Sequence, residues 1–290
     1  MMKKQIIFLA VLLLCCACTK KEKLIIGGSG WQHIAIIDKE SGKIEWQHDL
    51  MPEEECNKVE VTPKGYILYA YKQGAKLIDR NHQVIWDYKA NEGEELHYAS
   101  YSDGNYVLAI CGMPARIVEL DNSGSQVKEI KFQTGIPNVK DQFRQIQKTT
   151  ENTYLIPLTG KYKISEMDEN GRFIRSALTG GMPFSVKVLN DGNWLVSCGE
   201  GRILAEVDPE TKGISKMIES SDLNFGSFLF VAEAIRYENG NTLIANGSKN
   251  GHHNDISQPL LLEINPSNQI VWRLPLNTEI GNVTTVYSFF

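Results

Sequence analysis

Hydrophobic and polar residues alternate along most of this chain in short runs that are separated by turn-forming residues. Residues 262–272 read LEINPSNQIVW: an alternating apolar run, a turn cluster and a second alternating run. This order is typical of a β-hairpin. Related segments begin at residues 34, 76, 117, 164 and 204. Six related hairpins in one chain predict a repeat architecture.

Each hairpin is the second half of a longer unit. In the second unit, short apolar runs at residues 58–62, 66–71, 76–78 and 84–88 are separated by turns. Four strands in about forty residues match the period of a propeller blade. Three later units share a turn before their second run, in SDGNYVL, NDGNWLV and ENGNTLI. Gly and Asn adopt positive φ at low cost, so this turn predicts a tight hairpin.

The two ends of the chain complete one another. The first unit, from Leu24, lacks a first strand, whereas Asn282–Phe290 (NVTTVYSFF) has the alternation of a first strand with nothing after it. We therefore expect Val283–Phe289 to supply the inner strand of the first blade, which closes the ring and leaves only short edges. The sequence predicts an all-β, six-bladed β-propeller of four-stranded antiparallel blades, formed as one domain by residues 24–290.

Acidic and tryptophan residues recur at fixed places in the units. Asp or Asn occupies the turn between the third and fourth strands, where its side chain can bond to its own backbone two residues on. We interpret this series as turn residues and not as metal ligands: Asp38, Asp79, Asp121, Asp168, Asp208 and Asn265. Trp46, Trp86 and Trp272 fall on the fourth strand. Each is expected to pack on the adjacent blade and to bury about 150–250 Å².

The first residues have a different character. Lys3 and Lys4 precede a short apolar stretch, Ile6–Leu14, and then LCCAC. This predicts a secretory signal over residues 1–17. The segment resembles a bacterial lipoprotein signal ending at Cys18, and the resemblance implies a diacylglycerol on Cys18, a tether over residues 18–23 and a lipid-anchored place in the bacterial cell envelope. A plain secretory peptide is the alternative.

Charge and cysteine content narrow the function classes. The formal net charge of −5 argues against a nucleic-acid partner, because such proteins carry a basic surplus. No apolar stretch after residue 20 is long enough to cross a bilayer. Cys56, Cys111 and Cys198 are odd in number and show no metal-binding spacing. We expect them to be buried and unpaired.

The repeated phrase apolar-x-x-[DN]-x-x-[SN]-[GQ]-x-[IV]-x-W resembles the repeats of quinoprotein-like (PQQ-repeat) propellers, and the [DN]-G-N turns resemble those of arylsulfotransferase-type propellers. The resemblance covers most of the chain after the leader and implies the fold, whereas function does not transfer with it. Quinoprotein dehydrogenases have eight blades and an adjacent cysteine pair beside the cofactor. Here six units are counted and the adjacent pair, Cys15–Cys16, lies in the leader, so no cofactor is expected.

Basic and imidazole groups are predicted to gather at one rim, because the start of strand one and the start of strand three open on the same face. Clustered positive charge would concentrate an anionic ligand, such as a carboxylated or sulfated glycan, with Arg116, Arg144 and Arg202 as forks. The alternative is that these are ordinary solvated strand ends. The predicted ligand-binding set is His33, Lys76, His97, Arg116, Arg144, Lys163, Arg202, Glu233 and, in the insert before the last hairpin, His252.

His97 and Glu233 are also the weak catalytic candidates, as an acid and a base near the axis. The resemblance to arylsulfotransferase-type propellers implies a working histidine at such a position. His252, His253 and Asp255 could bind a metal, but paired histidines in a polar insert are more often solvated, so no metal is predicted. The preferred hypothesis is a membrane-tethered module that binds an anionic ligand or an envelope protein. The alternatives are an envelope enzyme acting on an anionic saccharide or an aryl ester, and a quinoprotein oxidoreductase.

Overall fold

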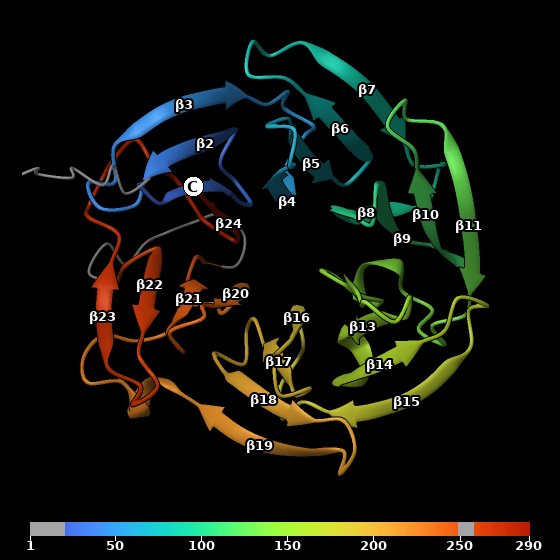
Figure 1. Cartoon of the computed structure of the whole chain (residues 1–290). Coiled ribbons are helices and arrows are strands. Elements are labelled where there is room, and N and C mark those ends of the chain that lie inside the picture. The colour runs from blue at the N-terminus through green and yellow to red at the C-terminus, as the bar shows by residue number, and fades with distance from the viewer. Residues whose placement is uncertain (1–20, 249–257) are drawn as a thin grey trace, which may run out of the picture.

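The computed structural model describes residues 21–248 and 258–290, and within these ranges 24 strands form six four-stranded sheets. The sheets stand like blades around a central axis, in chain order (Figure 1). Every pairing inside a blade joins antiparallel neighbours. The predicted six-bladed propeller of four-stranded antiparallel blades is confirmed.

Each blade contributes one strand at each of four distances from the axis. The inner strands are β24 (Thr285–Phe289), β4 (Cys56–Val61), β8 (Glu95–Ser102), β12 (Gln147–Lys148), β16 (Ser185–Val188) and β20 (Glu233–Arg236). The second strands are β1 (Lys23–Gly27), β5 (Ile67–Tyr71), β9 (Asn105–Cys111), β13 (Tyr154–Leu158), β17 (Trp194–Ser197) and β21 (Thr242–Ala245). The third strands are β2 (His33–Asp38), β6 (Gly74–Ile78), β10 (Ala115–Leu120), β14 (Lys163–Met167), β18 (Leu204–Asp208) and β22 (Leu261–Ile264). The outer strands are β3 (Ile44–Asp49), β7 (Val84–Lys89), β11 (Gln126–Phe132), β15 (Phe173–Leu178), β19 (Gly213–Ile218) and β23 (Ile270–Arg273).

The ring is closed by the C-terminal strand. β24 pairs with β1 in a register that runs from Lys23 opposite Phe289 to Gly27 opposite Thr285. The order of the first blade is therefore β24, β1, β2, β3, as the sequence predicted. Closure satisfies the inner edge of β1, which would otherwise present unpaired backbone groups.

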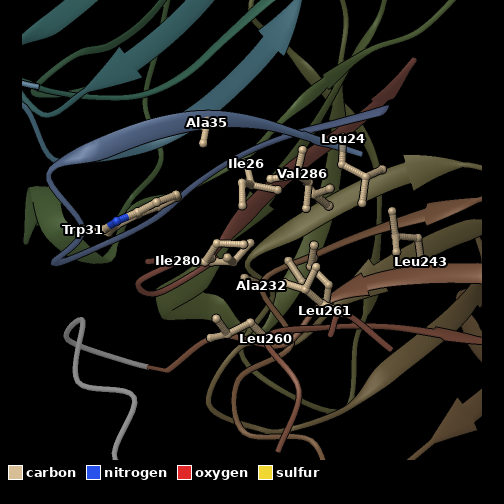
Figure 2. Packing of buried hydrophobic residues seen from close by; sticks show 14 of the residues in the cluster. Leu24, Ile26, Trp31, Ala35, Ala232, Leu243, Leu260, Leu261, Ile280 and Val286 are labelled. Carbon is tan, nitrogen blue, oxygen red and sulfur yellow. The ribbon is translucent and has the colours of Figure 1, made fainter. Parts of the chain in front are cut away.

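The core consists of apolar layers between neighbouring blades. Where the last blade meets the first, Leu24 and Ile26 of β1 pack with Leu243 of β21 and Val286 of β24, as Figure 2 shows. These four side chains are fully buried. Burying such a side chain stabilises a fold by about 1.5–3 kcal/mol. The second strands are covered on both faces by adjacent blades, which explains why their sequences are almost entirely apolar.

The recurring residues occupy the places that their spacing predicted. Asp121 Oδ1 accepts from the backbone N–H groups of Ser123 (2.8 Å) and Ser125 (3.0 Å), and the other turn residues of the series make equivalent bonds. Trp86 of β7 packs edge-on against Tyr106 of the next blade, with ring centroids 5.1 Å apart. Both predictions are confirmed, and the acidic series serves the turns.

The three cysteines of the propeller are free and buried, as expected. Burial raises the pKa of each thiol to about 12, so they are inert at neutral pH. The described part of the chain contains no helix with the length and apolarity needed to cross a membrane. Residues 1–20, with the predicted signal and Cys18, lie outside the described ranges, as does His252.

Candidate functional site

A cavity of about 410 Å³ opens at one mouth of the central channel, and we call it the axial pocket. It lies at the end where the inner strands begin. All six blades contribute a residue at or just before the start of the inner strand: Asn57, His97, Gln145, Phe184, Phe230 and Thr284. Loops between second and third strands complete the rim with Ser29, Lys72, Thr159, Gly199, Glu200 and Ser248.

A β-bulge directs His97 into the axial pocket. On β8, Leu96 pairs with Ile110 and Tyr98 pairs with Ala109, so His97 is an extra residue without a partner on β9. Bulges leave the extra residue outside the ladder and re-aim its side chain. The His97 side chain lines the pocket and is only 7% exposed.

The environment of His97 fixes its protonation state. Its Nε2 lies 3.1 Å from a carboxylate oxygen of Glu95, whose other oxygen lies 3.1 Å from Lys72 Nζ. The hydrogen bond from His97, assisted by Lys72, lowers the pKa of Glu95 to about 2 despite burial, so this carboxylate only accepts. Burial lowers the pKa of His97 to about 4, and the charge of Arg144 acts in the same direction. At neutral pH the imidazole is uncharged, with its proton on Nε2.

Two side chains that line the axial pocket carry hydrogen-bond acceptors that lack donors. His97 Nδ1 and Gln145 Oε1 are buried, and no described residue donates to either atom. The Gln145 amide is oriented because its Nε2 donates to the Asn57 carbonyl over 3.1 Å. A buried acceptor left without a donor costs about 1–3 kcal/mol. A ligand with hydroxyl or N–H groups would provide the missing donors.

Charged side chains also line the axial pocket. Arg144 donates to the Phe143 carbonyl, and neither Arg144 nor Lys140 forms an ion pair with any residue in 21–248 or 258–290. Two carboxylates, Glu55 and Glu200, also line the pocket, so its charges have both signs. The cations belong to the segment that leads into β12.

An aromatic wall faces part of the axial pocket. Phe184 and Phe230 meet edge to face, with centroids 5.2 Å apart, and Met182 lies beside them along the lining. Gly199 permits this arrangement, since a Cβ built on it would lie 3.0 Å from the Phe230 ring, and its φ is +34°. Aromatic faces of this kind bind the apolar side of a ligand.

The predicted rim residues within the described ranges fall in three places: the axial pocket, the starts of the third strands, and the other end of the channel. His97 and Arg144 meet in the axial pocket. The residues at the starts of third strands do not line it, because the third strand stands two strand spacings of about 4.8 Å outside the inner strand. Lys163 and Arg202 are in this group. Of the others, His33 hydrogen-bonds to Asp49, and two form ion pairs: Lys76 with Glu54, and Arg116 with Glu94 and Glu129.

Glu233 lies elsewhere, in a cavity of about 370 Å³ at the other end of the channel, which we call the opposite cavity. The structure therefore gives His97 and Glu233 no shared pocket, and the partner of His97 is Glu95. The opposite cavity is again lined by every inner strand, further along each one: Lys58, Ser100, Gln147, Lys187, Glu233 and Val286.

A buried ion pair stands at the inner end of the opposite cavity. Lys58 Nζ lies 2.6 Å from Glu233 Oε1, and Lys187 Nζ lies 3.5 Å from the same oxygen. Glu233 Oε2 accepts from Thr285 Oγ1 (2.8 Å) and from Val286 N–H (3.1 Å). Burial alone would raise the pKa of Glu233, but the two ammonium groups hold it below its usual value. Glu233 is thus a fixed anion that joins β4, β16, β20 and β24.

Several lining residues were missed from the sequence. Lys72, Lys140, Gln145, Phe184 and Phe230 all line the axial pocket. Their place in the repeat could have identified them, because each lies in the loop before an inner strand or just after the end of a second strand. Most of the predicted binding residues lie instead at the far end of the loop between the second and third strands, where the chain has already moved away from the axis. Among the described residues no cluster of three or more His, Cys, Asp or Glu side chains could hold a metal.

Comparison with known proteins identifies a family and similar solved structures. The family profile described as Mal s 1 allergenic protein-like matches residues 29–260. A crystal structure of a protein of unknown function from Bacteroides caccae is 34% identical, with a TM-score of 0.86 over 92% of this chain and 98% of that chain. No curated protein matches the sequence.

More distant structures share the fold. A streptogramin B lyase is 12% identical, with a TM-score of 0.58 over 89% of both chains. A catalytically inactive virginiamycin B lyase from Staphylococcus aureus with quinupristin is also 12% identical, with a TM-score of 0.58 over 90% of this chain and 87% of that chain. At this identity the likeness concerns the fold alone.

Proposed function

The chain belongs to the Mal s 1 allergenic protein-like family, and from that premise we propose that its axial pocket binds a small anionic molecule that carries hydroxyl groups, such as an acidic sugar. The observation that carries this proposal is the pair of buried acceptors, His97 Nδ1 and Gln145 Oε1, in the same pocket as Arg144. The acceptors would bind O–H groups of the ligand, and the guanidinium would bind a carboxylate or a sulfate.

The dimensions and the walls of the pocket support a small ligand. A cavity of about 410 Å³ falls in the range of small-molecule sites, which is about 300–1,000 Å³. Phe184 and Phe230 add an apolar surface to the polar lining, and such a surface suits the C–H face of a sugar ring. Hydroxyl donors on one side and a negative charge on another distinguish this ligand class from simple anions.

Isothermal titration with three matched probes tests the proposal. Glucuronate has both hydroxyl groups and a carboxylate, glucose lacks the charge, and acetate lacks the hydroxyl groups. We expect glucuronate to bind more tightly than either of the others. Equal binding of acetate and glucuronate, or no binding of glucuronate at about 10 mM, a Kd that corresponds to less than about 3 kcal/mol, would contradict the proposal.

Two variants assign the binding to the axial pocket. Arg144→Met should weaken glucuronate binding by about tenfold or more, since hydrogen bonds to charged groups contribute about 1.5–3 kcal/mol. Lys43→Met is the matched control, because Lys43 is exposed in the turn before β3, outside the pocket lining. Equal losses in the two variants would show that binding reflects general charge and not this site.

A second candidate function is an elimination at the same site, which one observation favours. Glu95 holds the neutral imidazole of His97 through Nε2, and the unpartnered Nδ1 belongs to a side chain that lines the axial pocket. Nδ1 would take the proton from the carbon next to a bound carboxylate, and the C–H electron pair would form a C=C bond. The C–O bond on the neighbouring carbon would break, and the departing oxygen would keep its electron pair and take a proton from water. Polyuronate should then yield an unsaturated product absorbing in the ultraviolet, and His97→Gln should abolish it. If the wild type gives no absorbance change, elimination is excluded and binding remains as the proposed function.

We also propose that a lipid on Cys18 holds the protein at a membrane. Glu22 and Lys21 lie beside the turn after β2, at the end of the propeller away from the axial pocket: Lys21 pairs with Asp38, and Glu22 accepts from Ser288 Oγ over 2.6 Å. A tether leaving from there would let the pocket face away from the membrane. Labelling with a clickable palmitate analogue should be lost in Cys18→Ser, and persistent labelling would contradict the anchor.

A further inference from the structure

Two ammonium groups in the opposite cavity share one carboxylate oxygen. Lys58 and Lys187 both approach one oxygen of Glu233, at 2.6 Å and 3.5 Å, and the other oxygen already has two donors. Lys58 is buried and takes the shorter contact. Lys187 is 27% exposed, and in the part of the chain that the structure describes it makes no closer bond. Its ammonium therefore has N–H donors left over.

The other carboxyl group of the opposite cavity does not bind Lys187. Both oxygens of Glu60 already accept, one from Ser100 Oγ over 2.8 Å and the other from the Tyr101 N–H, and burial raises the pKa of this group. The Gln147 oxygen accepts from Val188 N–H over 2.6 Å, and its NH₂ group has no acceptor among the described residues. The cavity thus offers unused donors, Lys187 and Gln147, and no unused acceptor of comparable strength.

The walls beside these donors are aromatic and apolar. Tyr101, Val188, Ile235 and Tyr287 line the opposite cavity together with the two lysines. An ammonium next to such walls suits an anion attached to a flat apolar body. We propose that the opposite cavity is a second binding site, separate from the axial pocket, for a small aromatic carboxylate held by Lys187.

Fluorine NMR titration of the mature protein with 4-fluorobenzoate tests this site, with neutral 4-fluorobenzamide as the matched probe. We expect saturable binding of the acid and at least tenfold weaker binding of the amide. Lys187→Met should weaken binding of the acid about tenfold or more, because it removes the charged donor. Lys43→Met should leave it unchanged, and excess glucuronate should not displace the acid.

A second variant blocks the cavity without touching its charges. Val188→Trp places a large side chain at the lining and should also abolish binding, so the proposal stays testable if Lys187→Met is unstable; the melting temperature of each variant reports its folding. The site is refuted if 4-fluorobenzoate fails to bind at about 10 mM, if the amide binds as well as the acid, or if both variants bind like the wild type. Displacement by glucuronate would also refute it, because the acid would then occupy the axial pocket.

Discussion

The two mouths of the channel are built from the same six strands and present opposite chemistry. The axial pocket has buried acceptors without donors, His97 Nδ1 and Gln145 Oε1. The opposite cavity has donors without acceptors, chiefly Lys187 beside a carboxylate that is already satisfied. The difference arises because, in each blade, residues at or just before the start of the inner strand line one mouth, and residues further along the chain line the other. A repeated blade can therefore carry two unrelated recognition surfaces without any change of fold.

Removing Lys58 should have the largest effect, since it is the buried partner of Glu233 in the lining of the opposite cavity. Lys58→Met leaves the Glu233 carboxylate buried with only the more distant Lys187, and breaking a buried pair in this way costs about 3–5 kcal/mol. Urea denaturation measures the loss. The double variant Lys58→Met, Glu233→Gln should recover most of it, and a loss below about 1 kcal/mol in the single variant would contradict this role.

The second-largest effect is expected at the axial pocket, where titration of His97 makes the free energy of unfolding depend on pH. In the folded protein the pKa of His97 lies near 4, below its usual 6.5, so protonation favours the unfolded chain. The stabilisation is complete above pH 6.5 and is lost as the pH falls toward 4, on the order of 3 kcal/mol in all. His97→Gln should remove this part of the loss. Parallel pH curves for the variant and the wild type would contradict the assignment.

The opposite cavity should show the reverse slope. Burial raises the pKa of Glu60, so the folded chain holds its proton more tightly, and stability is lost as the pH rises above the usual value of 4.5. Glu60→Gln should therefore gain stability relative to the wild type at pH 8 compared with pH 4.5. Urea denaturation at the two pH values decides the sign, and a gain at the lower pH would contradict the account.

The smallest effect is expected at a residue that the sequence assigned to the binding rim. Arg202 is exposed and lies outside the lining of the axial pocket. Arg202→Ala should change glucuronate affinity by less than about twofold, because surface substitutions away from a site usually act within about 0.5 kcal/mol. A tenfold loss of affinity would show that Arg202 takes part in binding, as the sequence predicted.

The fold was predictable because it depends on periodicity. Alternation, the [DN]-G-N turns and the missing first strand each report local or repeated geometry, and they led to six blades and to closure by β24. Asp121 and its counterparts were likewise predictable as turn residues, because an aspartate bonds to a backbone only two residues away.

The site was less predictable because it depends on small offsets in three dimensions. The bulge at His97 and the course of each loop decide which residue reaches the axis, and neither leaves a signature in the sequence. Arg116 lies near the start of a third strand, as predicted, but Glu94 of the loop before β8 and Glu129 of β11 bind its guanidinium. Such ion pairs depend on which segments lie side by side in the fold, and a single sequence does not show this.

The most direct test of two distinct mouths is long-range ¹H–¹⁵N NMR of the His97 imidazole at neutral pH. The structure predicts a neutral ring with its proton on Nε2, and a saturable shift of Nδ1 toward a hydrogen-bonded acceptor when glucuronate is added. 4-Fluorobenzoate should leave the Nδ1 signal in place. A protonated ring at neutral pH, or an Nδ1 signal that responds to 4-fluorobenzoate and not to glucuronate, would contradict the account.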